Sequence, residues 1–132
     1  MLKIDIPFGD AYIEVPLDMP LWAEIRAGDV RMKDVSFPVK INMLAGDAEI
    51  KYKKLKDLHL EAMAGDVRIF VPEDASFKLS SNVSIGSFTL PDRLKGMKFP
   101  IEWGNPPFAE LYISLSAGDG KLHFIKKEGK NE

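Results

Sequence analysis

Residues 62–74 read AMAGDVRIFVPED, and the triplet Ala64-Gly65-Asp66 near their start is written four times in the chain. The other copies are Ala27-Gly28-Asp29, Ala45-Gly46-Asp47 and Ala117-Gly118-Asp119. After the triplet, Val67, Ile69 and Val71 alternate with other residues, which is typical of a β-strand. A recurring Gly-Asp beside a strand suits a metal site, a phosphate loop or the corner of a repeated fold. The surrounding pattern bears on which of these is present.

The pattern has a period. The glycines that align on it are Gly9, Gly28, Gly46, Gly65, Gly86 and Gly118, at intervals of 19, 18, 19, 21 and 32 residues. Three residues before and four residues after each of these glycines, the residue is apolar. A fixed period of this length indicates a repeat architecture, in which each unit buries its apolar face against its neighbours.

Each repeat predicts two strands joined by a corner. The apolar positions directly before each glycine and two residues after it are three apart, so the alternation is shifted by one residue. A bend at this point suits Gly and Asp. We expect the alanines of the triplets, Ala27, Ala45, Ala64 and Ala117, to point inward and to be small because a corner has little room. The only helical turn expected is near 92–96.

These repeats predict an all-β, single-domain β-solenoid of stacked coils of about 18–19 residues, in which strands lie about 4.8 Å apart. The alternative is an antiparallel β-sandwich, in which turn signals also recur regularly. We expect residues 1–125 to form one β-repeat domain, with an irregular insertion at 94–110 and a disordered tail at 126–132. A chain of 132 residues is long enough to bury a core.

The composition limits the cellular environments and the classes of partner that suit this chain. Hydrophobic residues make up 45% and charged residues 29%, and the net charge of -2 gives no pull toward nucleic acid. The chain has no cysteine, which favours a cytosolic or other non-oxidising environment. No apolar run approaches the eighteen or so residues that span a bilayer. We therefore expect no transmembrane segment in this chain, no nucleic-acid partner, and a location that is cytoplasmic or peripheral to the membrane.

The aspartates of the corners would form a column along the stack. Calcium takes six to eight oxygen ligands, which stacked carboxylates can supply in part. Asp side chains also accept hydrogen bonds from nearby backbone N–H groups at turns, and a third reading is an acidic ridge that meets a partner. We expect the corner residues to be structural and to hold no metal or cofactor; they are Gly28, Asp29, Gly46, Asp47, Gly65, Asp66, Gly118 and Asp119.

No catalytic residue is expected. His59 and His123 fall in different repeats and have no cysteine or His-x-His partner, so they predict no zinc site. No nucleophile elbow surrounds Ser114, which could otherwise be combined with His123 and Asp119 on paper. Each Gly-Asp is followed by a strand and not by a helix, which argues against a phosphate loop.

Two stretches are candidates for interaction. Lys51, Lys53 and Lys54 form a basic run that suits phosphate or an acidic surface, or a solvated strand face that discourages edge pairing. Phe99, Trp103 and Phe108 concentrate in the insertion, which either carries a binding loop or folds back over the stack. Gly104 lies 18 residues after Gly86, so a degenerate coil is a further reading.

The motifs FGDAYIEVP at 8–16 and AGDVRIFVPED at 64–74 resemble the β-repeats of LiaF-like C-terminal and adhesin-type domains of bacterial envelope-stress proteins. The resemblance covers residues 5 to 90 and returns at 111 to 125. It implies a non-catalytic interaction domain in envelope-stress or membrane-associated signalling, with a protein partner or self-association. The alternatives are a self-assembling scaffold similar to bactofilins, and a sugar-binding protein or enzyme that uses the Trp103 loop.

Overall fold

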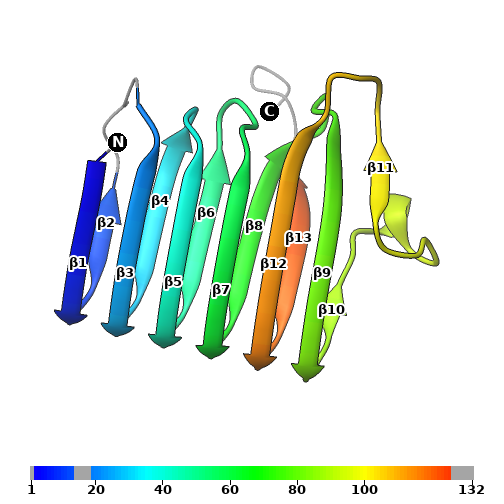
Figure 1. Cartoon of the computed structure of the whole chain (residues 1–132). Coiled ribbons are helices and arrows are strands. Elements are labelled where there is room, and N and C mark those ends of the chain that lie inside the picture. The colour runs from blue at the N-terminus through cyan, green and yellow to red at the C-terminus, as the bar shows by residue number, and fades with distance from the viewer. Residues whose placement is uncertain (1, 14–18, 126–132) are drawn as a thin grey trace.

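The computed structural model describes residues 2–13 and 19–125, and in these ranges almost every element is a β-strand (Figure 1). Six strand pairs form coils, and the corner of each coil is a Gly-Asp or Gly-Ser. The first three are β1 (Leu2–Phe8) with β2 (Ala11–Ile13), β3 (Leu21–Ala27) with β4 (Val30–Val35), and β5 (Val39–Ala45) with β6 (Ala48–Tyr52). The others are β7 (Leu58–Ala64) with β8 (Val67–Pro72), β9 (Phe77–Ile85) with β10 (Phe88–Thr89), and β12 (Ala109–Ala117) with β13 (Gly120–Ile125).

The coils stack so that their strands form two facing sheets. The seven-stranded sheet has the order β1-β3-β5-β7-β12-β9-β11, and the six-stranded sheet has the order β10-β13-β8-β6-β4-β2. Every pairing between coils is parallel, and residues at the same position of successive repeats lie opposite each other, as Ala27 lies opposite Ala45. Parallel pairing of consecutive repeats confirms the solenoid and excludes the antiparallel sandwich.

The last coil does not occupy the end of the stack. Strands β12 and β13 lie between the β7–β8 coil and the β9–β10 coil, as the orange strand between two green ones shows in Figure 1. The order of the coils in the stack therefore differs from their order in the chain. The long interval between Gly86 and Gly118 contains the segment by which the chain leaves the end of the stack and returns to its interior.

Side-chain sizes fit this insertion. Gly120 pairs with Phe88, and a Cβ atom at position 120 would meet the Phe88 ring at 2.5 Å. The other coils carry Ala or Val at this inward position. The glycine of the inserted coil therefore leaves room for the one aromatic ring in the column.

The core consists of the inward residues of both sheets, such as Ile41, Leu60 and Ile113, all fully buried. The residue directly before each glycine is not among them. Ala45 and Ala64 are exposed, and the large residues at the same position, Phe8 and Ile85, are 81% and 71% exposed. The expectation that these alanines point inward is wrong, because the chain leaves the extended conformation at the corner and the alternation does not continue through it.

The segment 91–108 covers the end of the stack next to β9. It contains a single 3₁₀ turn η1 (Asp92–Leu94) and the strand β11 (Ile101–Trp103), which pairs antiparallel with Phe77–Leu79 of β9. Leu94 and Ile101 are fully buried. The backbone around Gly104 packs against Ser76, and it forms no further coil.

Candidate functional site

The corner aspartates form a hydrogen-bonded ladder. The Asp10 carboxylate accepts the backbone N–H of Asp29 at 3.0 Å, and the same bond joins each aspartate to the next coil at 3.1 Å. The ladder runs in spatial order through Asp29, Asp47, Asp66 and Asp119 and ends on Ser87, whose N–H donates to the Asp119 carboxylate. One oxygen of each carboxylate therefore serves the backbone of the neighbouring corner.

The glycines of the corners stack directly on one another. Gly65 has a φ of +133°, and a Cβ atom at this position would overlap the carbonyl oxygen of Gly46. Backbone therefore meets backbone along the whole column, and only glycine fits inside it. Gly9, at the first coil, has open space at the same point.

The basic run does not lie at a sheet edge. Lys51 lies on β6, between β4 and β8, so the reading of an edge-protecting face is wrong. Its ammonium group stacks over the Phe70 ring at 5.3 Å, and Phe70 stacks on His123. Lys53 and Lys54 are exposed in the turn after β6, where their N–H groups donate to the Val35 carbonyl.

The aromatic residues of the insertion lie elsewhere, at the covered end of the stack. Trp103 is half-buried against Phe124, with ring centroids 5.8 Å apart. Phe99 meets Phe88 edge-to-face at 6.0 Å, and Phe108 is half-buried. This packing favours the covering role over the binding loop. The lysines of the third coil and these rings do not form one site.

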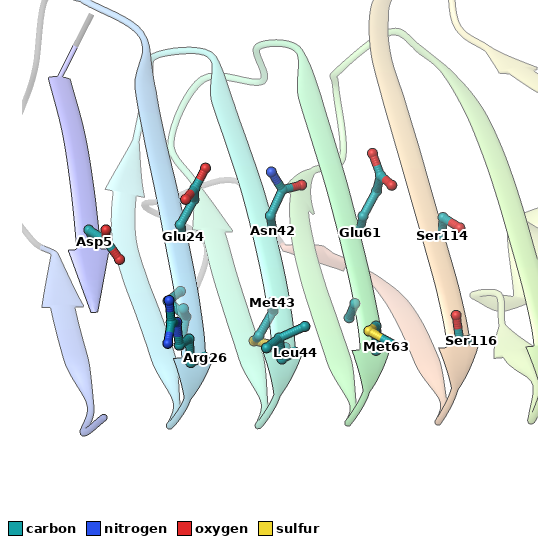
Figure 2. A pocket seen from close by; sticks show the side chains of 12 residues that line it. Asp5, Glu24, Arg26, Asn42, Met43, Leu44, Glu61, Met63, Ser114 and Ser116 are labelled. Atoms are coloured by element: carbon teal, nitrogen blue, oxygen red, sulfur yellow. The ribbon is translucent and has the colours of Figure 1, made fainter. Parts of the chain in front are cut away.

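The outer face of the seven-stranded sheet carries side chains in rows, because equivalent residues of successive coils lie side by side. Figure 2 shows one of these rows crossing five strands, and we call it the acid–amide row: Asp5, Glu24, Asn42, Glu61 and Ser114. Every member can accept hydrogen bonds from a ligand on the face.

A second row, two residues earlier on each strand, mixes aromatic and basic groups. It consists of Lys3, Trp22, Lys40, His59 and Tyr112, and we call it the aromatic row. Both lysines stack over the Trp22 ring, at 4.7 and 4.8 Å, and His59 stacks on Tyr112 at 4.8 Å. His59 Nε2 lies 2.6 Å from a Glu61 carboxylate oxygen, which ties the two rows together.

The third row, next to the corners, exposes apolar side chains. Leu44 is 50% and Met63 59% exposed on adjacent coils, between Arg26 and Ser116 (Figure 2). A groove of about 570 Å³ runs over this row and the acid–amide row. It combines apolar contact area with acceptors, which is the mixture found in interaction surfaces.

The outer face of the six-stranded sheet is arranged differently. Its exposed side chains pair with one another across strands: Arg31 donates to the Tyr12 hydroxyl at 3.2 Å, and Arg68 lies 3.7 Å from Glu49. Cross-strand pairs of this kind stabilise the sheet itself. The seven-stranded sheet has such pairs too, in its aromatic row, but it also exposes Leu44 and Met63 beside a groove, which makes this face the stronger candidate site.

Of the groove residues, the sequence drew attention only to Ser114, as a possible catalytic serine and not as part of a surface. The signal was present in the alignment, since the outward positions four residues before each glycine are all polar: Asp5, Glu24, Asn42, Glu61, Asn82 and Ser114. The two positions that follow this row on the same face, Leu44 and Met63, break the polar pattern with apolar residues. An exposed apolar pair at outward positions is the feature that marks the groove.

Tyr52 is the one titratable group in the core with a displaced pKa. Its side chain is 3% exposed, and its hydroxyl has no hydrogen-bond partner among the described residues. Burial, with a smaller contribution from Asp57, raises the pKa of Tyr52 far above its ordinary value. The hydroxyl therefore loses its proton at a higher pH in the folded chain than in the unfolded chain.

We expect Tyr52→Phe to stabilise the fold by about 1 kcal/mol at neutral pH, because it removes an unpaired buried hydroxyl. Above about pH 10 the unfolded chain ionises Tyr52 while the folded chain does not, so stability falls as pH rises, by up to about 1.4 kcal/mol per pH unit. The variant lacks this loss. Denaturant unfolding from neutral to alkaline pH measures the free energy of unfolding of both proteins. If it falls as steeply with pH in the variant as in the wild type, Tyr52 is not the cause of the fall.

In residues 2–13 and 19–125, no three His, Asp or Glu side chains gather in a way that could hold a metal ion. Among the same residues, no helix has the length and apolar character needed to cross a membrane.

Comparison with known proteins agrees with this architecture. The Toastrack DUF4097 family model matches residues 21–102, which is more than half of the chain. No curated protein and no solved structure matches. The matched range includes the second to fifth coils in chain order and most of the segment that covers the end of the stack. The chain belongs to the Toastrack DUF4097 family of β-repeat domains.

Proposed function

We propose that the chain is a non-catalytic interaction domain that binds a protein partner on the outer face of the seven-stranded sheet. The observation that supports this is the exposed pair Leu44 and Met63, which lies in a groove beside the acid–amide row. Exposed apolar side chains rimmed by polar groups are typical of protein interaction sites. A flat parallel sheet is also a rigid platform, so binding requires little reorganisation.

The charges of the groove indicate the kind of partner. Asp5, Glu24 and Glu61 supply carboxylates, and Arg26 is the basic residue that lines the groove with them. A partner with lysine or arginine side chains around an apolar centre fits this arrangement. The resemblance to LiaF-like domains supports a role in envelope-stress or membrane-associated signalling, with the domain cytoplasmic or peripheral to the membrane.

Leu44→Glu together with Met63→Glu tests this proposal. The double variant places two charges on the apolar centre, and we expect at least a tenfold loss of the partners that bind there. The chain is immobilised, and the proteins it retains from an extract of the cells that produce it are quantified by mass spectrometry. Both side chains are exposed, so the fold should melt as the wild type does.

A matched control comes from the corners. Phe8→Glu together with Ile85→Glu makes the same change in charge at two other exposed apolar residues outside the groove. We expect this control to retain the same proteins as the wild type. If the groove variant also retains the whole set, the groove is not the binding surface.

A further inference from the structure

The two ends of the solenoid are not equivalent. At one end, β11 pairs with β9 and the buried side chains of Leu94 and Ile101 cover the core. At the other end, β1 is the outermost strand of its sheet and pairs only with β3 among the described strands. Ile4 and Ile6, inward residues on β1, are only partly buried. A strand that lies outermost among the described residues presents backbone groups to any strand that approaches it.

The direction of the free backbone groups follows from the repeat. Leu21 directs its N–H toward the next coil, donating to the Pro38 carbonyl at 2.9 Å, and Leu2 is its register partner. Successive N–H groups of a strand point to opposite edges. The backbone groups of Ile4 and Ile6 therefore point toward β3. Those of Lys3, Asp5 and Pro7 point toward the open edge.

Proline at position 7 supports this direction. Proline has no N–H, and within a sheet it is tolerated where that group would face away from the neighbouring strand. Pro7 thus ends the row of donors on the open edge. Only Lys3 and Asp5 remain there to exchange N–H···O bonds within the section 3–7.

The sequence of this edge is complementary to itself. When a second β1 is laid antiparallel with Ile4 opposite Ile4, Lys3 falls opposite Asp5 and Asp5 opposite Lys3. The backbone N–H and C=O groups of Lys3 and Asp5 face the open edge. Each Lys3–Asp5 pair therefore exchanges two N–H···O bonds, as in the hydrogen-bonded pair of an antiparallel ladder. The side chains of each pair carry opposite charges on the outer face.

We propose that two copies of this chain form a closed, two-fold symmetric dimer by antiparallel pairing of their β1 strands. The symmetry places the same contacts on both copies. Ile4 and Ile6 of the two copies join their cores, and the sheet continues across the interface. Antiparallel addition already occurs in this sheet, at β11 on the opposite end.

The same features argue against an open polymer. A head-to-tail filament requires the β9–β10 end of one copy to accept the β1 end of another, and β11 already pairs with Phe77–Leu79 of β9 at that edge. The aspartate ladder also ends there, because Ser87 stands where the other corners have Asp. The assembly therefore closes at two copies.

Asp5→Lys tests the pairing. In the single chain the new lysine lies beside Glu24, its register partner, so the fold gains an opposite charge. In the dimer it faces Lys3 of the second copy, and this like-charge contact occurs twice. We expect the dissociation constant of the dimer to rise by about tenfold or more. Sedimentation equilibrium of the full chain over a wide concentration range measures it.

Two further variants complete the test. Lys3→Glu combined with Asp5→Lys restores opposite charges across the interface, and we expect it to recover the dimer. Glu61→Lys makes the same change of charge in the same row but three coils from the edge, and it should leave the dimer unchanged. Thermal unfolding of each variant verifies that the fold is intact.

The outcomes separate this inference from the proposed function. A wild-type chain that stays monomeric, a polymer that grows with concentration, or a dimer indifferent to Asp5→Lys each overturns the β1 pairing. The Leu44→Glu and Met63→Glu variant leaves β1 untouched and should dimerise as the wild type does. Loss of partner binding in that variant with an intact dimer supports both the binding groove and the β1 dimer. The groove can be refuted while the dimer stands, and the dimer can be refuted while the groove stands.

Discussion

Gly65→Ala is expected to destabilise the fold by more than about 4 kcal/mol, or to prevent folding altogether. The new Cβ atom would overlap the Gly46 carbonyl oxygen, and the backbone of both residues is hydrogen-bonded to the next coil, Gly46 N–H to Ala64 and Gly65 N–H to Ala117. The φ of +133° adds strain for any residue with a side chain. Neither atom can move without separating the third coil from the fourth.

Gly9→Ala is the matched comparison, since Gly9 has the same place in its repeat and a φ of +105°. Its Cβ atom would meet open space, so only the backbone strain of about 1–3 kcal/mol remains. Denaturant unfolding of the two variants separates stacking from strain. Equal losses in both would show that the conformation of the corner, and not the stacking of coils, requires glycine.

This difference marks what the repeat pattern does and does not reveal. The apolar positions around the glycines predict the period, the strand on each side of the corner and the parallel stack, because each coil must bury the same face. Whether a given glycine has a neighbour above it depends on the order of the coils. Gly9 and Gly65 look alike in the sequence and differ in the stack.

The order of the coils could have been read from two residues. A corner aspartate accepts an N–H from the next coil, so the coil with Ser87 in place of Asp suits the end of the ladder, and the coil with Asp119 suits its interior. Gly120 opposite Phe88 points to the same neighbours. These signals concern pairs of repeats, and a pattern that treats every repeat alike does not contain them.

The groove escaped prediction for a related reason. Apolar periodicity identifies the residues that face the core, whereas a binding surface consists of the residues between them. Leu44 and Met63 stand at outward positions, where an apolar side chain has no structural purpose within the coil. The rings of Trp103 and Phe99 attracted attention as candidates, yet they pack against Phe124 and Phe88.

Ile113→Ala tests the order of the coils by its effect on stability. Ile113 lies on β12, fully buried, with Leu60 of β7 on one side and Ser81 of β9 on the other. Removing its side chain leaves a cavity enclosed by neighbours on both sides, and we expect a loss of about 2–5 kcal/mol. Denaturant unfolding of the variant against the wild type gives the value.

Ile4→Ala is the control, because Ile4 holds the same position of the repeat in the outermost strand β1 and is only partly buried. In the single chain, at protein concentrations where the β1-paired dimer is dissociated, we expect it to cost about 1 kcal/mol, since a partly exposed side chain loses less contact and leaves no closed cavity. If the coils stacked in chain order, Ile113 would also lie at an end of the solenoid and the two losses would be similar. A loss at Ile113 several times that at Ile4 requires β12 to lie inside the stack, between the β7–β8 coil and the β9–β10 coil.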